Sequence, residues 1–198
     1  MKYKGKEQTR KAKRSARARS IRASSFGVQN SELRIQNPLR LGLGNDLHRL
    51  APGRKLILGG VRIPFAKGPV GHSDGDALAH AICDALLGAA ALGDIGQHFP
   101  DTSPKWRNAS SLLFLHHARK LLEQAGYAIV NVDATVGLEH PRIASYIPRM
   151  RKKLAAALGI KPAQVSVKAK TGEGVDAVGQ GVALRADAIA LVAATGEL

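Results

Sequence analysis

The chain has 198 residues, is 44% hydrophobic and carries a formal net charge of +15. This length and apolar content suffice for one globular domain with a buried core. No run approaches the roughly eighteen apolar residues that a membrane-spanning helix requires, and the single cysteine, Cys83, excludes an intrachain disulfide framework. We therefore expect a cytoplasmic protein in a reducing setting that makes no membrane contact.

The positive charge is concentrated at the start of the chain. Residues 1–40 hold 12 Lys and Arg residues against two acids, Glu7 and Glu32. Residues 1–37 have almost no apolar periodicity, so we predict a basic, disordered extension before a domain at 38–198. Charge alone would let the extension touch nucleic acid, but we expect no function from such contact. An Arg- and Ser-rich start is also typical of an organelle transit peptide, which is a minor alternative.

The first predicted elements are a strand, a hairpin and a buried helix. Residues 39–50 begin with alternating apolar residues and then reach Gly44-Asn45-Asp46, which predicts a turn. Gly59-Gly60 predicts a hairpin within 56–65. Apolar residues then recur at helical spacing over 77–89, and Asp74 or Asp76 can cap this helix.

The second half predicts a further helix at 110–126, with polar and apolar sides. Its inward side would hold Leu113, Leu121 and Leu122, and its solvent side His116 and His117. The remaining predicted elements are a strand at 127–137, a helix at 148–158, and strands at 163–171 and 182–194. Together they indicate an α+β fold, a two-layer sandwich of a mixed β-sheet with helices packed on one face.

Two clusters of polar residues are candidates for chemistry. Asp76, His80 and Asp84 are spaced by four residues and share one stripe of the central helix. Taken alone, His80 is most simply a hydrogen-bonded core histidine. Asp46 and His48 would point to the same face of an extended segment, which suits two ligands of one metal ion but also occurs in ordinary surface turns.

From Leu39 to Ala193 the sequence resembles the 2-C-methyl-D-erythritol 2,4-cyclodiphosphate synthases, the cyclases of the non-mevalonate isoprenoid pathway. The resemblance rests on motifs at 44–48 (GNDLH), 59–65 (GGVRIPF), 72–76 (HSDGD) with His80, 84–96, 99–102 (FPDT), 131–133 (NVD) and 167–179 (VKAKTGEGVDAVG). It implies a homotrimer with active sites between subunits. It also implies conversion of a cytidine diphosphate substrate, 4-diphosphocytidyl-2-C-methyl-D-erythritol 2-phosphate, to the cyclodiphosphate with release of CMP.

The resemblance also implies cofactors and site residues. Asp46, His48 and His80 would bind one Zn²⁺ per subunit, and Glu173 would bind a second ion, Mg²⁺ or Mn²⁺. His72 and Thr171 would be catalytic. The substrate would contact Ser73, Asp94, Ile95, Gly96, Phe99, Pro100, Asp101, Thr102, Ser103, Leu138, Pro141, Arg142, Ile143, Lys170 and Glu173. Asp76 and Asp84 become candidates for orienting the metal ligands, and helix capping is the equally favoured alternative.

Some positions depart from the family pattern, and two other functions remain open. Gln180 stands where many members carry an arginine facing the central trimer cavity, so we do not expect an isoprenoid diphosphate to bind there. A metal-dependent phosphoesterase could use the same zinc site, although the loops at 137–144 and 168–173 favour a nucleotide substrate. A nucleic-acid-binding module would instead use the basic extension.

Overall fold

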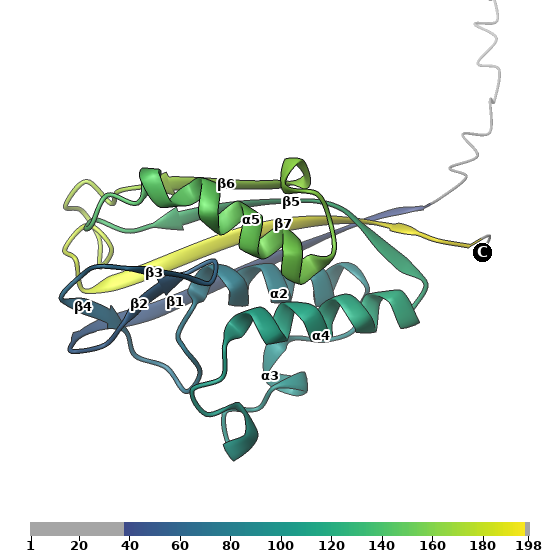
Figure 1. Ribbon diagram of the computed structural model, residues 1–198, viewed down its shortest axis with the longest axis horizontal. Coiled ribbons are helices and arrows are strands. Elements are labelled where there is room, and N and C mark those ends of the chain that lie inside the picture. Colours follow the sequence, from purple (N-terminus) through teal and green to yellow (C-terminus); the bar gives the residue numbers. More distant parts are fainter. Residues whose placement is uncertain (1–37, 197–198) are drawn as a thin grey trace, which may run out of the picture. The chain divides into compact units, whose positions relative to one another are not determined.

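The computed structural model describes residues 38–196. The predictions for residues 1–37 lie outside this range. The main sheet has five strands in the order β4-β1-β7-β5-β6, with β5 and β6 parallel and the other neighbours antiparallel (Figure 1). These strands are β1 (Leu39–Pro52), β4 (Lys67–Pro69), β5 (Tyr127–Gly137), β6 (Val165–Lys170) and β7 (Ala183–Ala194).

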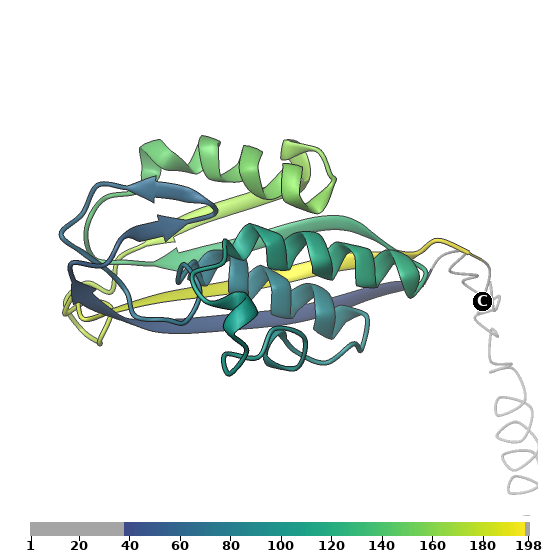
Figure 2. The same cartoon turned by 60° about the horizontal axis from the view of Figure 1, so that its bottom comes forward.

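Three longer helices cover one face of this sheet (Figure 2). They are α2 (Ala77–Ala89), α4 (Ser111–Gln124) and α5 (Ile147–Leu158). The short elements are the hairpin β2 (Leu56–Leu58) and β3 (Val61–Ile63), the helix α3 (Ile95–His98), and the 3-10 turns η1 (Pro104–Trp106), η2 (Ala144–Tyr146) and η3 (Pro162–Gln164). The predicted α+β sandwich with a mixed sheet is confirmed. None of the helices within 38–196 is long and apolar enough to cross a membrane.

The two faces of the sheet differ in polarity, as the period of two in a strand requires. The face under the helices carries small or aliphatic side chains, which on β7 are Leu184, Ala186, Ala188, Ala190 and Val192. Helix α2 packs on β1 and β7, α4 packs on α2, and α5 packs on β6. The core therefore lies between the sheet and the helices.

The opposite face of β1 is apolar yet exposed. Leu39, Leu41, Leu43 and Leu47 are 57 to 66% exposed, and Ile189 on the neighbouring strand β7 is 43% exposed. We call these five residues the outer apolar face. No part of the described chain covers it.

The predicted turn at Gly44-Asn45-Asp46 is wrong, because β1 runs unbroken from Leu39 to Pro52 and pairs these residues with 186–188 of β7. The glycines serve a different purpose. A Cβ atom at Gly42 would lie 1.9 Å from the carbonyl oxygen of Ala85, and one at Gly44 would lie 2.1 Å from that of Ala81. Glycine is present because the backbones of β1 and α2 touch.

The predicted facing of helix α4 is partly wrong. Leu122 is buried and His117 is exposed, as expected, but Leu113 is 50% exposed. Phe114 and Leu115 point inward instead. Residues 112–115 are all apolar, so their hydrophobicity did not determine which of them faces the core.

Candidate functional site

The close contact between β1 and α2 brings three potential metal ligands together. Asp46 and His48 lie two residues apart on β1, on the same face as Gly44, and His80 lies near the start of α2. Asp46 Oδ2 is 2.9 Å from His80 Nδ1 and 3.1 Å from His48 Nδ1. One potential ligand atom from each residue lies within 4.8 Å of the other two. We call Asp46, His48 and His80 the ligand cluster.

The cluster has the composition of a site for a divalent ion. Nδ1 of His48 is buried, and its 3.1 Å contact with Asp46 Oδ2 does not have the geometry of a hydrogen bond. Such an atom is rare in folded proteins, and a metal ion is one partner that satisfies it. Two imidazole nitrogens and one carboxylate oxygen also match the donor set of zinc sites that leave a coordination position open. The residues present therefore fit a bound divalent cation.

The pKa shifts in the cluster also favour a bound cation. Burial would raise the pKa of Asp46, but its attraction to the imidazoles of His48 and His80 outweighs burial and lowers the pKa to about 2. Burial would lower the pKa of His80, but the Asp46 carboxylate outweighs it and raises the pKa. The Asp46 carboxylate thus lies between two imidazoles, and a cation bound there can replace the protons on the imidazole nitrogens that face it.

Asp76 and Asp84, the other acids on the stripe of α2, contact backbone N–H groups. Asp76 caps α2 by accepting from Ala79, and it also accepts from the N–H groups of Gly59 and Gly60 in the β2–β3 hairpin. Asp84 accepts from the N–H of Ile95 at 2.7 Å. Of the two predicted roles for Asp76, the structure shows helix capping.

A cavity of about 570 Å³ adjoins the ligand cluster. It is lined by eight predicted site residues in addition to His48 and His80, namely His72, Ser73, Ile95, Gly96, Phe99, Pro100, Asp101 and Thr102. Two further predicted residues lie beside it. Asp94 caps α3, and the carbonyl oxygen of Ser103 accepts a hydrogen bond from Nε2–H of His72 at 3.2 Å.

The cavity also has an aromatic wall that the sequence motifs did not reveal. Phe114 stacks on Phe99 with ring centroids 4.6 Å apart, and Trp106 and Phe99 pack at near right angles with ring centroids 5.2 Å apart. Trp106 and Phe114 both line the cavity, together with Gly71. Placing Phe114 inward on α4 would have identified part of this wall.

The remaining predicted residues do not line this cavity. They lie at the ends of two strands: Leu138, Pro141, Arg142 and Ile143 follow β5, Lys170 is the last residue of β6, and Thr171 and Glu173 follow it. We call these two segments, 138–143 and 170–173, the nucleotide loops, after the role that the family resemblance predicts for them. They lie at the same end of the sheet as the cluster, because Gly137 pairs with Lys170 and with Arg185, and Arg185 pairs with Leu47. Strands β7 and β5 intervene, so β6 lies about 14 Å from β1.

Hydrogen bonds within the nucleotide loops shape the turn after β6. The Thr171 hydroxyl donates to a carboxylate oxygen of Glu173, and the N–H of Gly172 donates to Glu139 at 2.9 Å. A Cβ atom at Gly172 would lie 2.3 Å from the backbone nitrogen of Gly179. The loop is thus compact and presents Glu173 to solvent.

A family model described as the YgbB family matches residues 39–193. The chain belongs to the YgbB family. A relative from Nitrosospira multiformis named 2-C-methyl-D-erythritol 2,4-cyclodiphosphate synthase is 53% identical over 167 residues, which are 84% of this chain and 94% of that protein.

Solved structures agree with this membership. A 2C-methyl-D-erythritol-2,4-cyclodiphosphate synthase with CDP bound is 37% identical at a TM-score of 0.72, covering 77% of this chain and 99% of its own. The bifunctional IspDF from Campylobacter jejuni is 34% identical at a TM-score of 0.77 and covers 80% of this chain. This chain corresponds to only 43% of that bifunctional protein.

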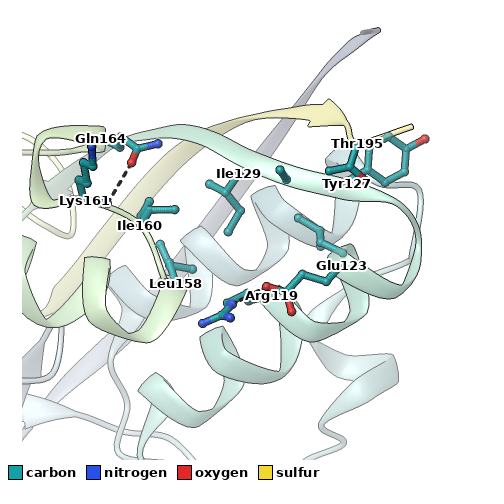
Figure 3. A pocket seen from close by; sticks show the side chains of 12 residues that line it. Arg119, Glu123, Tyr127, Ile129, Leu158, Ile160, Lys161, Gln164 and Thr195 are labelled. Carbon is teal, nitrogen blue, oxygen red and sulfur yellow. Dashed lines mark hydrogen bonds and ion pairs between the residues drawn. The ribbon is translucent and has the colours of Figure 1, made fainter. Parts of the chain in front are cut away.

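A second cavity, of about 680 Å³, lies between α4, α5 and β5 (Figure 3). Arg119 and Glu123 form an ion pair at 2.7 Å in it, and Gln164 accepts from the backbone N–H of Lys161. None of the predicted site residues lines this cavity. In this YgbB-family member, the cavity beside the ligand cluster is therefore the candidate active site.

Proposed function

We propose that this chain converts 4-diphosphocytidyl-2-C-methyl-D-erythritol 2-phosphate to 2-C-methyl-D-erythritol 2,4-cyclodiphosphate and CMP, a step of isoprenoid biosynthesis. The observation that carries the proposal is a ligand cluster at the edge of a cavity holding His72, in a chain 53% identical to a cyclodiphosphate synthase. The alternative of a generic phosphoesterase explains the cluster but not the nucleotide loops.

Two divalent ions complete the proposal. The ligand cluster would hold one Zn²⁺ per chain, and the exposed carboxylate of Glu173 would hold Mg²⁺ or Mn²⁺. When bound, such ions supply positive charge that polarises phosphate oxygens and neutralises the charge of the transition state.

The side chains of the cavity would position the attacking phosphate and the sugar. In this reaction the nucleophile, the 2-phosphate, and the leaving group, CMP, belong to the same substrate, so the protein acts mainly by alignment and charge stabilisation. The bond from His72 Nε2 to Ser103 holds the imidazole and leaves Nδ1 for the attacking phosphate, with Ser73 beside it. Asp94, Ile95, Gly96 and residues 99–103 would hold the methylerythritol hydroxyls.

The nucleotide loops would bind the part of the substrate that leaves. Thr171 and the neighbouring N–H groups would hold the phosphate that becomes CMP. Leu138, Pro141, Arg142, Ile143 and Lys170 would contact cytosine and ribose. A relative with CDP bound supports a cytidine ligand for this fold.

We also propose a homotrimer in which the loops of one subunit complete the cavity of the next. Two features of the single chain support it. The outer apolar face is exposed over two strands, and large exposed apolar patches mark interaction surfaces. The nucleotide loops are also separated from their own cavity by two strands.

The test combines metal analysis with product analysis. Protein purified without chelator should contain about one zinc per chain, and it should release CMP and cyclodiphosphate in equal amounts from the cytidyl substrate. Release of inorganic phosphate without cyclodiphosphate would favour the phosphoesterase instead. Full activity in zinc-free protein would reject the assignment of the ligand cluster.

A further inference from the structure

The imidazole of His80 has partners on both sides of its ring. Nδ1 faces Asp46 in the ligand cluster, whereas Nε2 lies 2.8 Å from the hydroxyl oxygen of Ser111. Ser111 is fully buried at the start of α4, and its hydroxyl donates a hydrogen bond to Oδ1 of Asp74. A chain of contacts thus runs from Asp74 through Ser111 to His80.

The number of protons on these groups determines which atom donates and which accepts in each hydrogen bond. The carboxylate of Asp74 accepts the Ser111 hydroxyl as well as the N–H groups of Ser111 and Asp76, at 3.1 and 3.2 Å. A serine hydroxyl has one proton, so the oxygen of Ser111 then has only lone pairs for His80. Nε2 of His80 must therefore carry a proton. When a cation displaces the proton that Nδ1 donates to Asp46, the lone pair of Nδ1 is directed at that cation.

We propose that Asp74 and Ser111 are positioning residues that hold His80 in the tautomer able to bind a metal through Nδ1. The inference rests on the proposed metal site and extends it to two residues that contact neither metal nor substrate. A carboxylate linked through a hydroxyl to the distal nitrogen fixes the ring's orientation and increases its basicity as a ligand.

The same contacts have a simpler explanation, in which Asp74 only caps α4. Oδ2 of Asp74 accepts the N–H of Ser111, and the residue before it, Ser110, makes no capping bond with its own side chain. Ser111→Ala separates the two explanations. It keeps the backbone N–H and hence the cap, but removes the hydroxyl that joins Asp74 to His80.

The expected result is a loss of zinc affinity without a matching loss of stability. In full-length protein, competition with a chelator should show zinc binding to Ser111→Ala weakened by about 10- to 100-fold. The loss should be partial, because the hydroxyl oxygen of Ser73 also lies 3.1 Å from Nε2. The unfolding midpoint of the metal-free variant should stay close to that of the wild type.

Two further variants serve as controls. Ser111→Thr keeps a hydroxyl at the same position and should restore most of the affinity. Ser110→Ala removes the adjacent, exposed hydroxyl that has no capping role, and its zinc affinity should stay within about twofold of the wild type.

The tautomer itself can be observed by nitrogen NMR of the zinc-loaded protein. Nε2 of His80 should carry a slowly exchanging proton in the wild type, and this proton should exchange faster in Ser111→Ala. Wild-type zinc affinity in Ser111→Ala would overturn the inference while leaving the proposed function intact. Failure of the wild type to bind zinc would instead overturn the metal site and the inference with it.

Discussion

Glu173 occupies an unusual backbone conformation for a residue with a side chain. Its φ of +50° lies in the left-handed region, which non-glycine residues adopt rarely. Gly174 follows it with a φ of +75°. The turn between β6 and β7 therefore presents the Glu173 carboxylate to solvent at a cost in backbone energy, which is typical of functional loops.

Glu173→Gln tests the proposed second metal ion. The change removes one negative charge and keeps the shape, so zinc content should stay at the wild-type level while the rate of CMP release falls by ~10²–10³. Higher magnesium or manganese should recover part of the rate. Glu123→Gln, on α4, is the control and should be fully active. Wild-type activity of Glu173→Gln at low magnesium would contradict the role.

Gly44 is required by the contact between β1 and α2. In Gly44→Ala, the new methyl group would lie 2.1 Å from the Ala81 carbonyl oxygen and 2.6 Å from the Ala85 nitrogen, so the helix must move. The free energy of unfolding should fall by about 3 kcal/mol or more. Zinc affinity should fall as well, because the shift separates Asp46 from His80.

Gly88→Ala is the matched control on α2. A Cβ atom at Gly88 has nothing within 4 Å, and the position is helical. Urea unfolding should show a gain of about 0.5–1 kcal/mol, the helix propensity of alanine over glycine. If both variants lost similar stability, the close backbone contact would not be the reason for Gly44.

At the scale of elements, Asp76 joins the β2–β3 hairpin to the start of α2. Its carboxylate is fully buried and accepts from Gly59, Gly60 and Ala79. Burial, aided by the charge of Asp74, raises the pKa of Asp76 to about 6 even though these N–H groups lower it. The connection between hairpin and helix therefore depends on the protonation of one side chain.

The expected pH dependence follows from the direction of that shift. Because the pKa is higher in the folded state, the contribution of Asp76 is fully present below pH 4 and is lost as the pH rises through about 6. Asp76→Asn does not titrate. From pH 4 to 7, the unfolding free energy of the wild type relative to Asp76→Asn should fall by up to about 3 kcal/mol. A pH-independent difference in urea unfolding would contradict the shift.

The sequence predicted the elements better than their contacts. The family resemblance identifies Asp46, His48 and His80 as one set, because their spacing alone is equally typical of a surface turn and a core histidine. The sequence wrongly predicts a turn at Gly44, because glycine serves both turns and close packing and only the distant Ala81 distinguishes them. The Ser111 contact lies 31 residues from His80 in sequence, beyond any local pattern.

At the scale of the whole molecule, Leu43 tests the proposed trimer. It is 66% exposed at the middle of the outer apolar face. Leu43→Glu should convert the trimer to monomers in sedimentation, because a charge cannot be buried there without a partner. The monomers should no longer release CMP, but they should still bind zinc because the ligand cluster lies within one chain.

Leu113→Glu is the control for this change. Leu113 is 50% exposed on α4, away from the outer apolar face, so its replacement should leave the trimer and the activity intact. Dissociation of both variants would show a general loss of folding. A Leu43→Glu protein that remained trimeric would place the subunit interface elsewhere.

Removal of the basic extension is the second test at this scale. Deletion of residues 1–35 should preserve CMP release and oligomeric mass, because every residue of the proposed site lies after Leu39. A truncated protein that lost both would make the extension part of the enzyme.

Side chains alternate between the two faces of β1, so this strand must present its metal ligands on one face and its exposed leucines on the other. Asp46 and His48 pair with Ala186 and Leu184 on the helix side, while Leu43 and Leu47 pair with Ile189 and Arg185 on the other. A slip of one residue would exchange the two sets, burying the leucines and expelling the ligands. Under the proposed function, only a correctly aligned β1 would take up the ion, so zinc content would measure the fraction of chains with the right alignment. A single residue inserted between Leu43 and Asp46 would place Leu43 and the two ligands on the same face, so β1 could then support metal uptake or self-association but not both.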